Sequence, residues 1–334
     1  KRIEINDGDV LISWSASLGV YVWNRGRALL NQHIFKVQFD KVNIDKSYFV
    51  YAVRQKLAEM AMKTHGATMK HIVKKDFEET LIPYPSLKKQ IEIGTNLDKI
   101  ANIIVARKQQ LELLDKLVKA RFVEMFGDPV KNDKGWRTLP LEDSCKSIVD
   151  CPHSTPAYTT EYTGYMCIRT SIIKKNKIMW DEVEYISEEE FVKRIQRKKP
   201  EVGDVVYTRE GAILGIAAII DRKCNVALGQ RLMLLSPDTN KCISEFLCVA
   251  MNCDSFLNNA LKGVAGSASP HINVGDIKMF RMIMPPIELQ NQFSDFVRAI
   301  DKSKVNYYYK NRKDGFPPLL FIYSVTTIIN LSDY

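Results

Sequence analysis

The stretch GSASPHINVGDI, residues 266–277, has a counterpart in GATMKHIVKKDF, residues 66–77. At an offset of 200 residues, a glycine, a histidine, an isoleucine and an aspartate coincide, at Gly66/Gly266, His71/His271, Ile72/Ile272 and Asp76/Asp276. Four matches in twelve positions could arise by chance. The flanking segments therefore decide whether the chain contains the same unit twice.

The flanking segments repeat as well. The matching pairs are NDGDVLI (6–12) with EVGDVVY (201–207), LLNQHIFKV (29–37) with ALGQRLMLL (227–235), and LIPYPSLKKQIEI (81–93) with IMPPIELQNQFSD (283–295). A period of about 200 residues is far longer than the roughly 20–50 residues of solenoid repeats. The pattern therefore predicts a duplicated whole domain.

Both copies have the same internal order. The β-branched and aromatic runs that follow each Gly-Asp-Val are interrupted by glycine, which predicts strands with tight turns. A helical stretch, the Gly–His–Ile turn and a last strand come next. Prolines at 83, 85, 285 and 286 then block further strand pairing and mark the exit from each domain.

The segment after the first pair of prolines has a different character. From Leu87 to Phe126 there is no proline and the only glycine is Gly94. Apolar residues recur every seven positions, which predicts one helix over 88–126 whose seam is buried by a second helix. At about 1.5 Å per residue such a helix is roughly 60 Å long. A long core helix within one globular domain is the alternative. The seam residues are Leu97, Ile104, Leu111, Val118 and Met125.

Composition sets broad limits on the class of protein. The 334 residues suggest two domains, and 46% hydrophobic with 26% charged residues is a globular balance. The net charge of +9 hints at a polyanionic partner. Yet residues 127–285 hold 21 Lys and Arg against 20 Asp and Glu, so any nucleic-acid surface must be local. Seven scattered cysteines indicate free thiols in a reducing cytosol, and we expect a cytoplasmic protein with no membrane partner.

The order of these features resembles the DNA-specificity subunit of Type I restriction–modification enzymes. The segments that carry the resemblance are PSLKKQ (85–90), KLVKARFVEMFGD (116–128), GWRTLPLED (135–143), EVGDVVYTREGAILG (201–215), GSASPHI (266–272) and PIELQ (286–290). The resemblance covers about residues 1–300. It implies an α+β fold in which duplicated, β-rich target recognition domains are separated by long coiled-coil helices.

The resemblance also implies a division of the chain. Residues 1–85 would be the C-terminal part of a first target recognition domain, 86–126 a long spacer helix, 127–285 a second recognition domain, 286–310 a shortened distal spacer helix, and 311–334 an atypical tail. The chain departs from the family pattern at both ends. The counterpart of residues 127–200 would precede residue 1, which leaves the first domain with an expected exposed edge. Near the other end, Lys304 stands where the first copy has Ile104, and the tail resembles a frame-shifted or rearranged end.

In that family the subunit is not catalytic. It reads a bipartite DNA site and positions DNA adenine methyltransferase subunits, which a restriction and motor subunit can join. The residues agree with this implication, because the sequence has no GxxxxGK[ST] phosphate loop, no Asn/Asp-Pro-Pro-aromatic motif and no HExxH. We therefore predict no catalytic residues, no metal ligands and no cofactor. A coiled-coil scaffold, or a disrupted or silent specificity cassette without DNA binding of its own, is the alternative.

Basic side chains are the candidates for DNA contact. Phosphates accept hydrogen bonds from Lys and Arg, and guanine is read by Arg or Lys. For each residue, an ordinary solvated charge is the alternative. Residues that match between copies, namely Gly8, Gly203, Gln32, Gln230 and the two turn histidines, are predicted to build the fold, because residues that specify a sequence should differ. The predicted DNA-binding residues are Arg169, Lys174, Lys175, Lys177, Arg209 and Arg231 in the second domain, and Arg25, Arg27, Lys70, Lys74 and Lys75 in the first.

Overall fold

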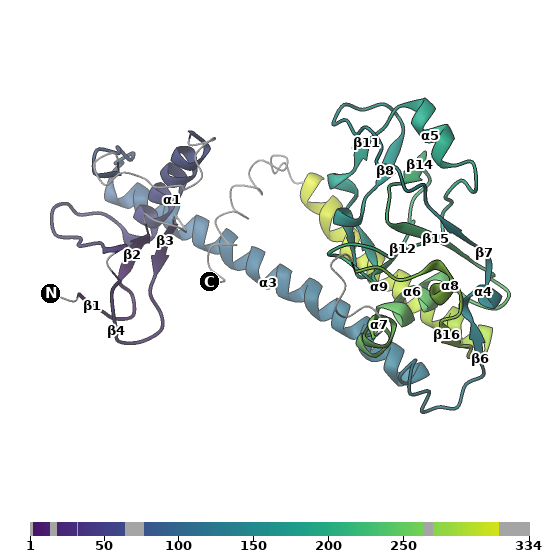
Figure 1. Cartoon of the computed structure of the whole chain (residues 1–334). Coiled ribbons are helices and arrows are strands. Elements are labelled where there is room, and N and C mark those ends of the chain that lie inside the picture. The colour runs from purple at the N-terminus through teal and green to yellow at the C-terminus, as the bar shows by residue number, and fades with distance from the viewer. Residues whose placement is uncertain (1–2, 14–18, 32, 64–76, 263–269, 314–334) are drawn as a thin grey trace. The chain divides into compact units, whose positions relative to one another are not determined.

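The computed structural model describes residues 3–13, 19–31, 33–63, 77–262 and 270–313. The chain forms two compact units, divided at Leu111/Glu112 and at Asn306/Tyr307. The fold is α+β, with small sheets and several helices in which the 40-residue helix α3 (Leu87–Phe126) is the longest element (Figure 1). Among the described residues, no helix combines the length and apolarity that a membrane crossing requires.

The first unit pairs a small sheet with one helix. Its larger sheet has the strand order β3-β2-β5, and a second sheet pairs β1 with β4. Val10 and Ile12, on one face of β2, and Val20 of β3 are buried together with apolar residues of α1 that recur at helical spacing. The elements are β1 (Glu4–Ile5), β2 (Val10–Ser13), β3 (Gly19–Val22), β4 (Ala28–Leu29), β5 (Ile34–Lys36) and α1 (Lys46–Lys63).

The second unit is built around the antiparallel sheet β13-β12-β15-β7. A second sheet, β11-β8-β14, contains the parallel pair β8/β14 (Figure 1). Two short antiparallel pairs, the hairpin β9/β10 and the long-range pair β6/β16, complete the strands. The strands are β6 (Thr138–Pro140), β7 (Cys145–Asp150), β8 (Met166–Ile168), β9 (Ile173–Lys174), β10 (Lys177–Ile178), β11 (Glu184–Tyr185), β12 (Val205–Thr208), β13 (Ala217–Ile219), β14 (Val226–Leu228), β15 (Leu232–Pro237) and β16 (Arg281–Ile283).

Short helices fill the connections between these strands. One of them, α5, begins with three glutamates at 188–190 and is capped by the Ser187 side chain, which accepts a hydrogen bond from the Glu190 amide. The short helices are α4 (Leu141–Ser144), α5 (Glu188–Arg194), α6 (Ser244–Asn252), α7 (Asp254–Leu261) and α8 (Val274–Lys278), with 3-10 turns at Thr170–Ile172 and Trp180–Glu182. The long helix α9 (Ile287–Lys313) follows β16.

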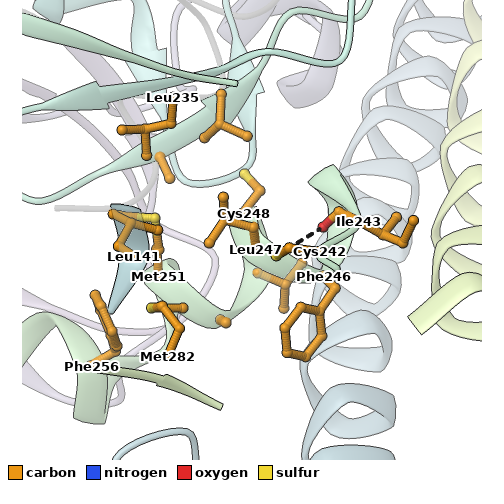
Figure 2. Packing of buried hydrophobic residues seen from close by; sticks show 14 of the residues in the cluster. Leu141, Leu235, Cys242, Ile243, Phe246, Leu247, Cys248, Met251, Phe256 and Met282 are labelled. Carbon is orange, nitrogen blue, oxygen red and sulfur yellow. Dashed lines mark hydrogen bonds between the residues drawn. The ribbon is translucent and has the colours of Figure 1, made fainter. Parts of the chain in front are cut away.

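Helix α6 lies at the centre of the largest core. Figure 2 shows side chains of α6 gathered with Leu235, Leu141 and Met282 from other elements. Beside them, fully buried rings from three helices meet with centroids 4.9–5.6 Å apart. These rings are Phe122 and Phe126 of α3, Phe246 of α6 and Phe293 of α9. The aromatic cluster therefore ties both long helices to the second domain.

The heptad seam predicts the course of α3, which runs without a break. Val118 is buried, and Leu97, Ile104 and Leu111 are half-buried. In the second unit α9 covers the seam, because Val118 shares a core with residues of α9. Phe122 meets Phe293, and Asp115 meets Lys304 further along, so the two helices run antiparallel.

Lys304 occupies a seam position as a charged residue. Its ammonium donates to Asp115 Oδ1 at 2.8 Å and to Asp301 Oδ1 at 3.0 Å. Burial lowers the pKa of Lys304, but the hydrogen bonds from the two carboxylates outweigh burial and raise the pKa above its ordinary value. The departure from the heptad pattern is thus accommodated by a half-buried ion pair.

The same turn begins the central strand in both units. Gly8 and Gly203 have φ values of 86° and 92°, a left-handed conformation that favours glycine. The aspartate that follows closes the turn: Asp9 accepts the Asn6 amide at 2.8 Å, and Asp204 accepts the Glu201 amide at 2.9 Å. The strand orders β3-β2-β5 and β13-β12-β15 then repeat one another. The predicted structural role of the two glycines is confirmed.

A buried glutamine near the start of each long helix makes the same hydrogen bonds in both units, and we call this arrangement the glutamine clamp. Gln90 and Gln290 are fully buried at the start of α3 and α9. Each side-chain amide donates to the carbonyl of the proline five residues earlier, at 2.8 and 2.9 Å. Each amide oxygen accepts a backbone N–H at 3.0 Å, from Asp45 just before α1 and from Ile243 just before α6. The duplication inferred from the sequence is therefore visible as repeated bonding. Gly66, His71, Gly266 and Gln32 lie outside the described residues.

Candidate nucleic-acid interface

Consecutive strand ends bring the predicted residues of the second domain to one end of the unit. Gly229 donates to Ile168 O at 2.8 Å, which places Arg169 beside the turn that carries Arg231. Arg209 follows β12 and donates its amide to Arg231 O at 3.1 Å. The β9/β10 hairpin joins the same end, because its Asn176 amide donates to Ala217 O at 2.9 Å. Six basic residues scattered over 63 positions of the chain therefore share one region.

Three of the six are held in ion pairs. Arg169 bonds Glu184 at 2.9 Å and lies over the Tyr158 ring. Lys175 bonds Asp254 at 2.7 Å, and this hydrogen bond lowers the pKa of the aspartate. These contacts orient loops of the unit. In this conformation the positive charges of Arg169 and Lys175, predicted to contact DNA, are paired with carboxylates of the same unit.

Arg209 is the most buried of the tied residues, with 6% of its side chain exposed. Its guanidinium donates to Asp150 Oδ1 at 2.9 Å and pairs with Glu210 at 2.7 Å. It also lies 3.3 Å from His153 Nδ1. A buried cation that satisfies two carboxylates braces the ends of β7 and β12 against each other. Its geometry suits positioning rather than direct contact with DNA.

Lys174, Lys177 and Arg231 remain accessible. All three are exposed, and among the described residues their side chains make no ion pair or hydrogen bond. Lys174 and Lys177 face each other across the hairpin register. Two ammonium groups in this arrangement can contact phosphates, and an unpaired guanidinium can contact a phosphate or a base edge.

The loop at 151–156 belongs to the same surface, and sequence reasoning missed it. Arg194, whose side chain is fully buried, donates to the carbonyl of Ser154 and pairs with Glu190 at 2.7 Å. Thr155 Oγ1 donates to Gln230 Oε1 at 2.9 Å. His153, Ser154 and Thr155 are exposed. The two prolines that flank these polar residues, at 152 and 156, were the available signal of a rigid loop.

The Gly–His–Ile turn also reaches this region. His271 forms an isolated bridge with Glu210, and Ile272 donates its amide to Arg209 O at 2.8 Å. Gln230, predicted to build the fold, is only half-buried, and its amide lies at the surface. The residues on either side of His271 therefore hold the turn by backbone hydrogen bonds, whereas Gln230 lies at the surface.

The first unit has fewer candidates within the described residues. Arg25 is exposed in a tight turn, where the Gly26 amide donates to Asp7 Oδ1 at 2.7 Å. Arg27 pairs with Glu4 at 2.8 Å and stays largely exposed. Lys70, Lys74 and Lys75 lie outside the described residues. Of the segments that the structure describes, none gathers three His, Cys, Asp or Glu in a way that could hold a metal ion.

Comparison with known proteins extends this picture. The chain is 23% identical over 315 residues to the Type I restriction enzyme MjaVIII specificity subunit of Methanocaldococcus jannaschii, covering 90% of this chain and 74% of that protein. It is 23% identical over 319 residues to the Type I restriction enzyme EcoBI specificity subunit of Escherichia coli, covering 88% of this chain and 66% of that protein.

A solved structure shares the fold. The crystal structure of a Type I restriction–modification system S subunit from M. genitalium aligns with a TM-score of 0.58 at 14% identity, over 98% of this chain and 83% of that one. The model of the Type I restriction modification DNA specificity domain matches residues 1–114 and again 133–307. The chain belongs to the family of Type I restriction–modification DNA specificity proteins.

Proposed function

We propose that this chain is the non-catalytic, cytoplasmic subunit that reads a bipartite DNA site within a Type I restriction–modification complex. The observation that carries the proposal is the duplication: the same glycine turn, strand order and glutamine clamp occur twice, each followed by a long helix. Two related units on one continuous helix suit a site in two halves, because the gap between half-sites is a fixed distance.

The second unit would approach duplex DNA with the end that carries Lys174, Lys177 and Arg231. The tied residues Arg169, Lys175 and Arg209 would shape this end, and in the first unit Arg25 and Arg27 are the described candidates. The near balance of charge in residues 127–285 means that few phosphates are attracted over a distance. The isolated chain should therefore bind weakly, with a small salt dependence.

Partner subunits would complete the complex. DNA adenine methyltransferase subunits would supply most of the phosphate contacts and all of the chemistry, and a restriction and motor subunit would join through them. The long helices α3 and α9 would serve as the spacer between half-sites. In this arrangement the length of α3 sets the gap that the complex recognises.

Shortening α3 by one heptad tests the proposal. The full chain would be co-expressed with the modification subunits of a Type I system, and methylated sites would be mapped across the host genome. Deleting residues 101–107 removes about 10.5 Å of helix and makes Leu97 and Leu111 neighbours in the seam. We expect two unchanged half-sites whose gap shrinks by about three base pairs, at 3.4 Å per pair.

The matched control is a Lys174→Ala chain, which should weaken methylation at all sites alike and leave the gap unchanged. An undivided methylated site, or a gap that ignores the length of a correctly folded α3, would contradict the proposal.

A further inference from the structure

Arg231 has an unusual backbone conformation for its residue type. Its φ is 72°, in the left-handed region. Of the three described non-glycine residues with positive φ, the other two are Asn132 and Asn176, and asparagine tolerates this region through local hydrogen bonds. An arginine gains nothing of that kind, and glycine would relieve the strain. A strained backbone at an exposed arginine indicates that the arginine side chain has a function at this position.

The surroundings hold the Arg231 side chain at the surface. Backbone pairing fixes both sides of the residue, since Arg231 O accepts the Arg209 amide and Leu232 pairs with Thr208. A methyl group added at Gly211 would lie 3.5 Å from an Arg231 guanidinium nitrogen, so the side chain lies across the Gly211 backbone. The neighbouring guanidinium groups of Arg169, Arg194 and Arg209 all have carboxylate partners, whereas that of Arg231 has none among the described residues.

The preceding residue is held as well. Gln230 is linked to Thr155 at 2.9 Å, and the loop that carries Thr155 is anchored by the fully buried Arg194 through the Ser154 carbonyl. Two buried arginines, Arg194 and Arg209, thus support the two segments that flank the Arg231 guanidinium. A recognition residue discriminates well only when its supporting contacts fix its position.

The two copies differ at this position. Arg231 corresponds to His33, directly after the matching glutamines Gln230 and Gln32. Residues that build both units should match, and residues that distinguish two half-sites should not. The two copies therefore share the glutamine at position 230 but differ in the residue that follows it at position 231.

We propose that Arg231 is a specificity-determining residue that reads a guanine edge in the major groove; this inference rests on the proposed function of DNA recognition. Arginine can donate two parallel hydrogen bonds to O6 and N7 of guanine, a pattern that no other base presents. Lys174 and Lys177 contact phosphates in this arrangement and carry no sequence information.

A binding selection separates these roles. The full chain, assembled with the modification subunits of a Type I system, would select duplexes from a randomised double-stranded DNA library at low salt, with sequencing before and after selection. The Arg231→Gly chain keeps the backbone conformation that φ of 72° requires, so its melting temperature should be equal to or above that of the wild type. We expect it to lose preference for one guanine by roughly 5- to 150-fold while all other positions keep theirs.

Two further variants test whether the paired donors of Arg231, rather than its charge, account for the guanine preference. Arg231→Lys keeps the charge but not the paired donors, so it should keep overall affinity and weaken the same guanine preference. Arg137→Ala, an exposed arginine of the same unit away from this end, should match the wild type. If Arg231→Gly lowers binding of all sequences equally, or leaves the selected motif intact, Arg231 is not a base-reading residue although DNA recognition stands. If the wild-type chain selects no motif, the proposed function itself fails.

Discussion

In the first unit Asp98 of α3 accepts hydrogen bonds from Ser47 Oγ at 2.7 Å and Tyr51 Oη at 2.9 Å. In the second unit the corresponding position is Arg298 of α9, which donates to Glu245 at 2.7 Å. Glu245 in turn corresponds to Ser47 at the usual offset of about 200. The long helix thus carries the negatively charged acceptor at this crossing in the first unit and the positively charged donor in the second.

The glutamine clamp behaves differently, since Gln90 and Gln290 make the same two bonds in both copies. A buried position that must donate to a carbonyl and accept from an N–H admits only a side-chain amide of the right length. At the exposed contact between the two helices, by contrast, the charged residue can be an acid or a base, provided that the facing helix supplies a partner. Comparison of the copies therefore separates positions fixed by backbone geometry from positions free to change.

The largest expected difference between the copies lies in aromatic packing. Phe293→Ala empties a fully buried ring site that packs against Phe122 and Phe126, and should cost the second unit roughly 3–5 kcal/mol of unfolding free energy. The counterpart Ile93 is only half-buried, so Ile93→Ala should cost the first unit about half as much or less. Chemical denaturation of the full chain, followed by probes in each unit, measures both. Equal losses would show that α3 and α9 are anchored alike.

Loss of the glutamine clamp should lower the unfolding free energy of the two units by more similar amounts. Gln90→Ala and Gln290→Ala each leave a buried N–H and carbonyl without partners, which should cost roughly 1–3 kcal/mol in either unit. Gln290 also donates to Lys241 O at 3.0 Å, so its loss should be the greater. Gln292→Ala, an exposed glutamine of the same helix, is the control and should be neutral. A clamp that matters in one unit alone would argue against a shared folding role.

The smallest effect concerns the reversed polarity at Asp98. Burial, followed by the Asp98 hydrogen bond and charge, raises the pKa of Tyr51 to about 12. Because the folded pKa lies above the unfolded value of 10.0, this contribution to stability is complete below pH 10 and is lost as the pH rises toward 12. Asp98→Asn removes the charge, so the pKa of Tyr51 should fall while burial keeps it above 10.

Tyrosinate absorbance during an alkaline titration measures this shift, with Tyr51→Phe identifying the signal. Arg298→Ala alters the other copy of the crossing and should leave the titration unchanged. An unaltered Tyr51 pKa in the Asp98→Asn chain would mean that burial alone sets it.

Features governed by local spacing were predictable from the sequence. The seven-residue recurrence of apolar side chains predicts α3 because a helix brings such residues to one face. The repeated Gly8/Gly203 turn and the glutamine after each proline were visible as matches, since identical backbone constraints select identical residues. Each of these inferences needs only neighbouring positions.

Pairing over long separations was not predictable. Arg209 lies in a glycine-rich loop, as an accessible residue would, but its partner Asp150 is 59 positions away in the sequence. Arg169 likewise meets Glu184 only because β8 pairs with β11. The sequence therefore identifies the basic residues of the candidate interface, whereas the fold determines which of them hold loops and which face outward.

The ion pair between Lys304 and Asp115 has a consequence for how precisely the two helices can measure a distance. A purely apolar seam would tolerate a slip of α9 along α3 by one heptad, about 10.5 Å, because one leucine or isoleucine packs much like the next. Such a slip would carry the half-buried ammonium away from its only cross-helix carboxylate among the described contacts. A single charged residue at a seam position selects one alignment in this way. In the proposed spacer role, this single alignment would remove an ambiguity of about three base pairs between the two half-sites.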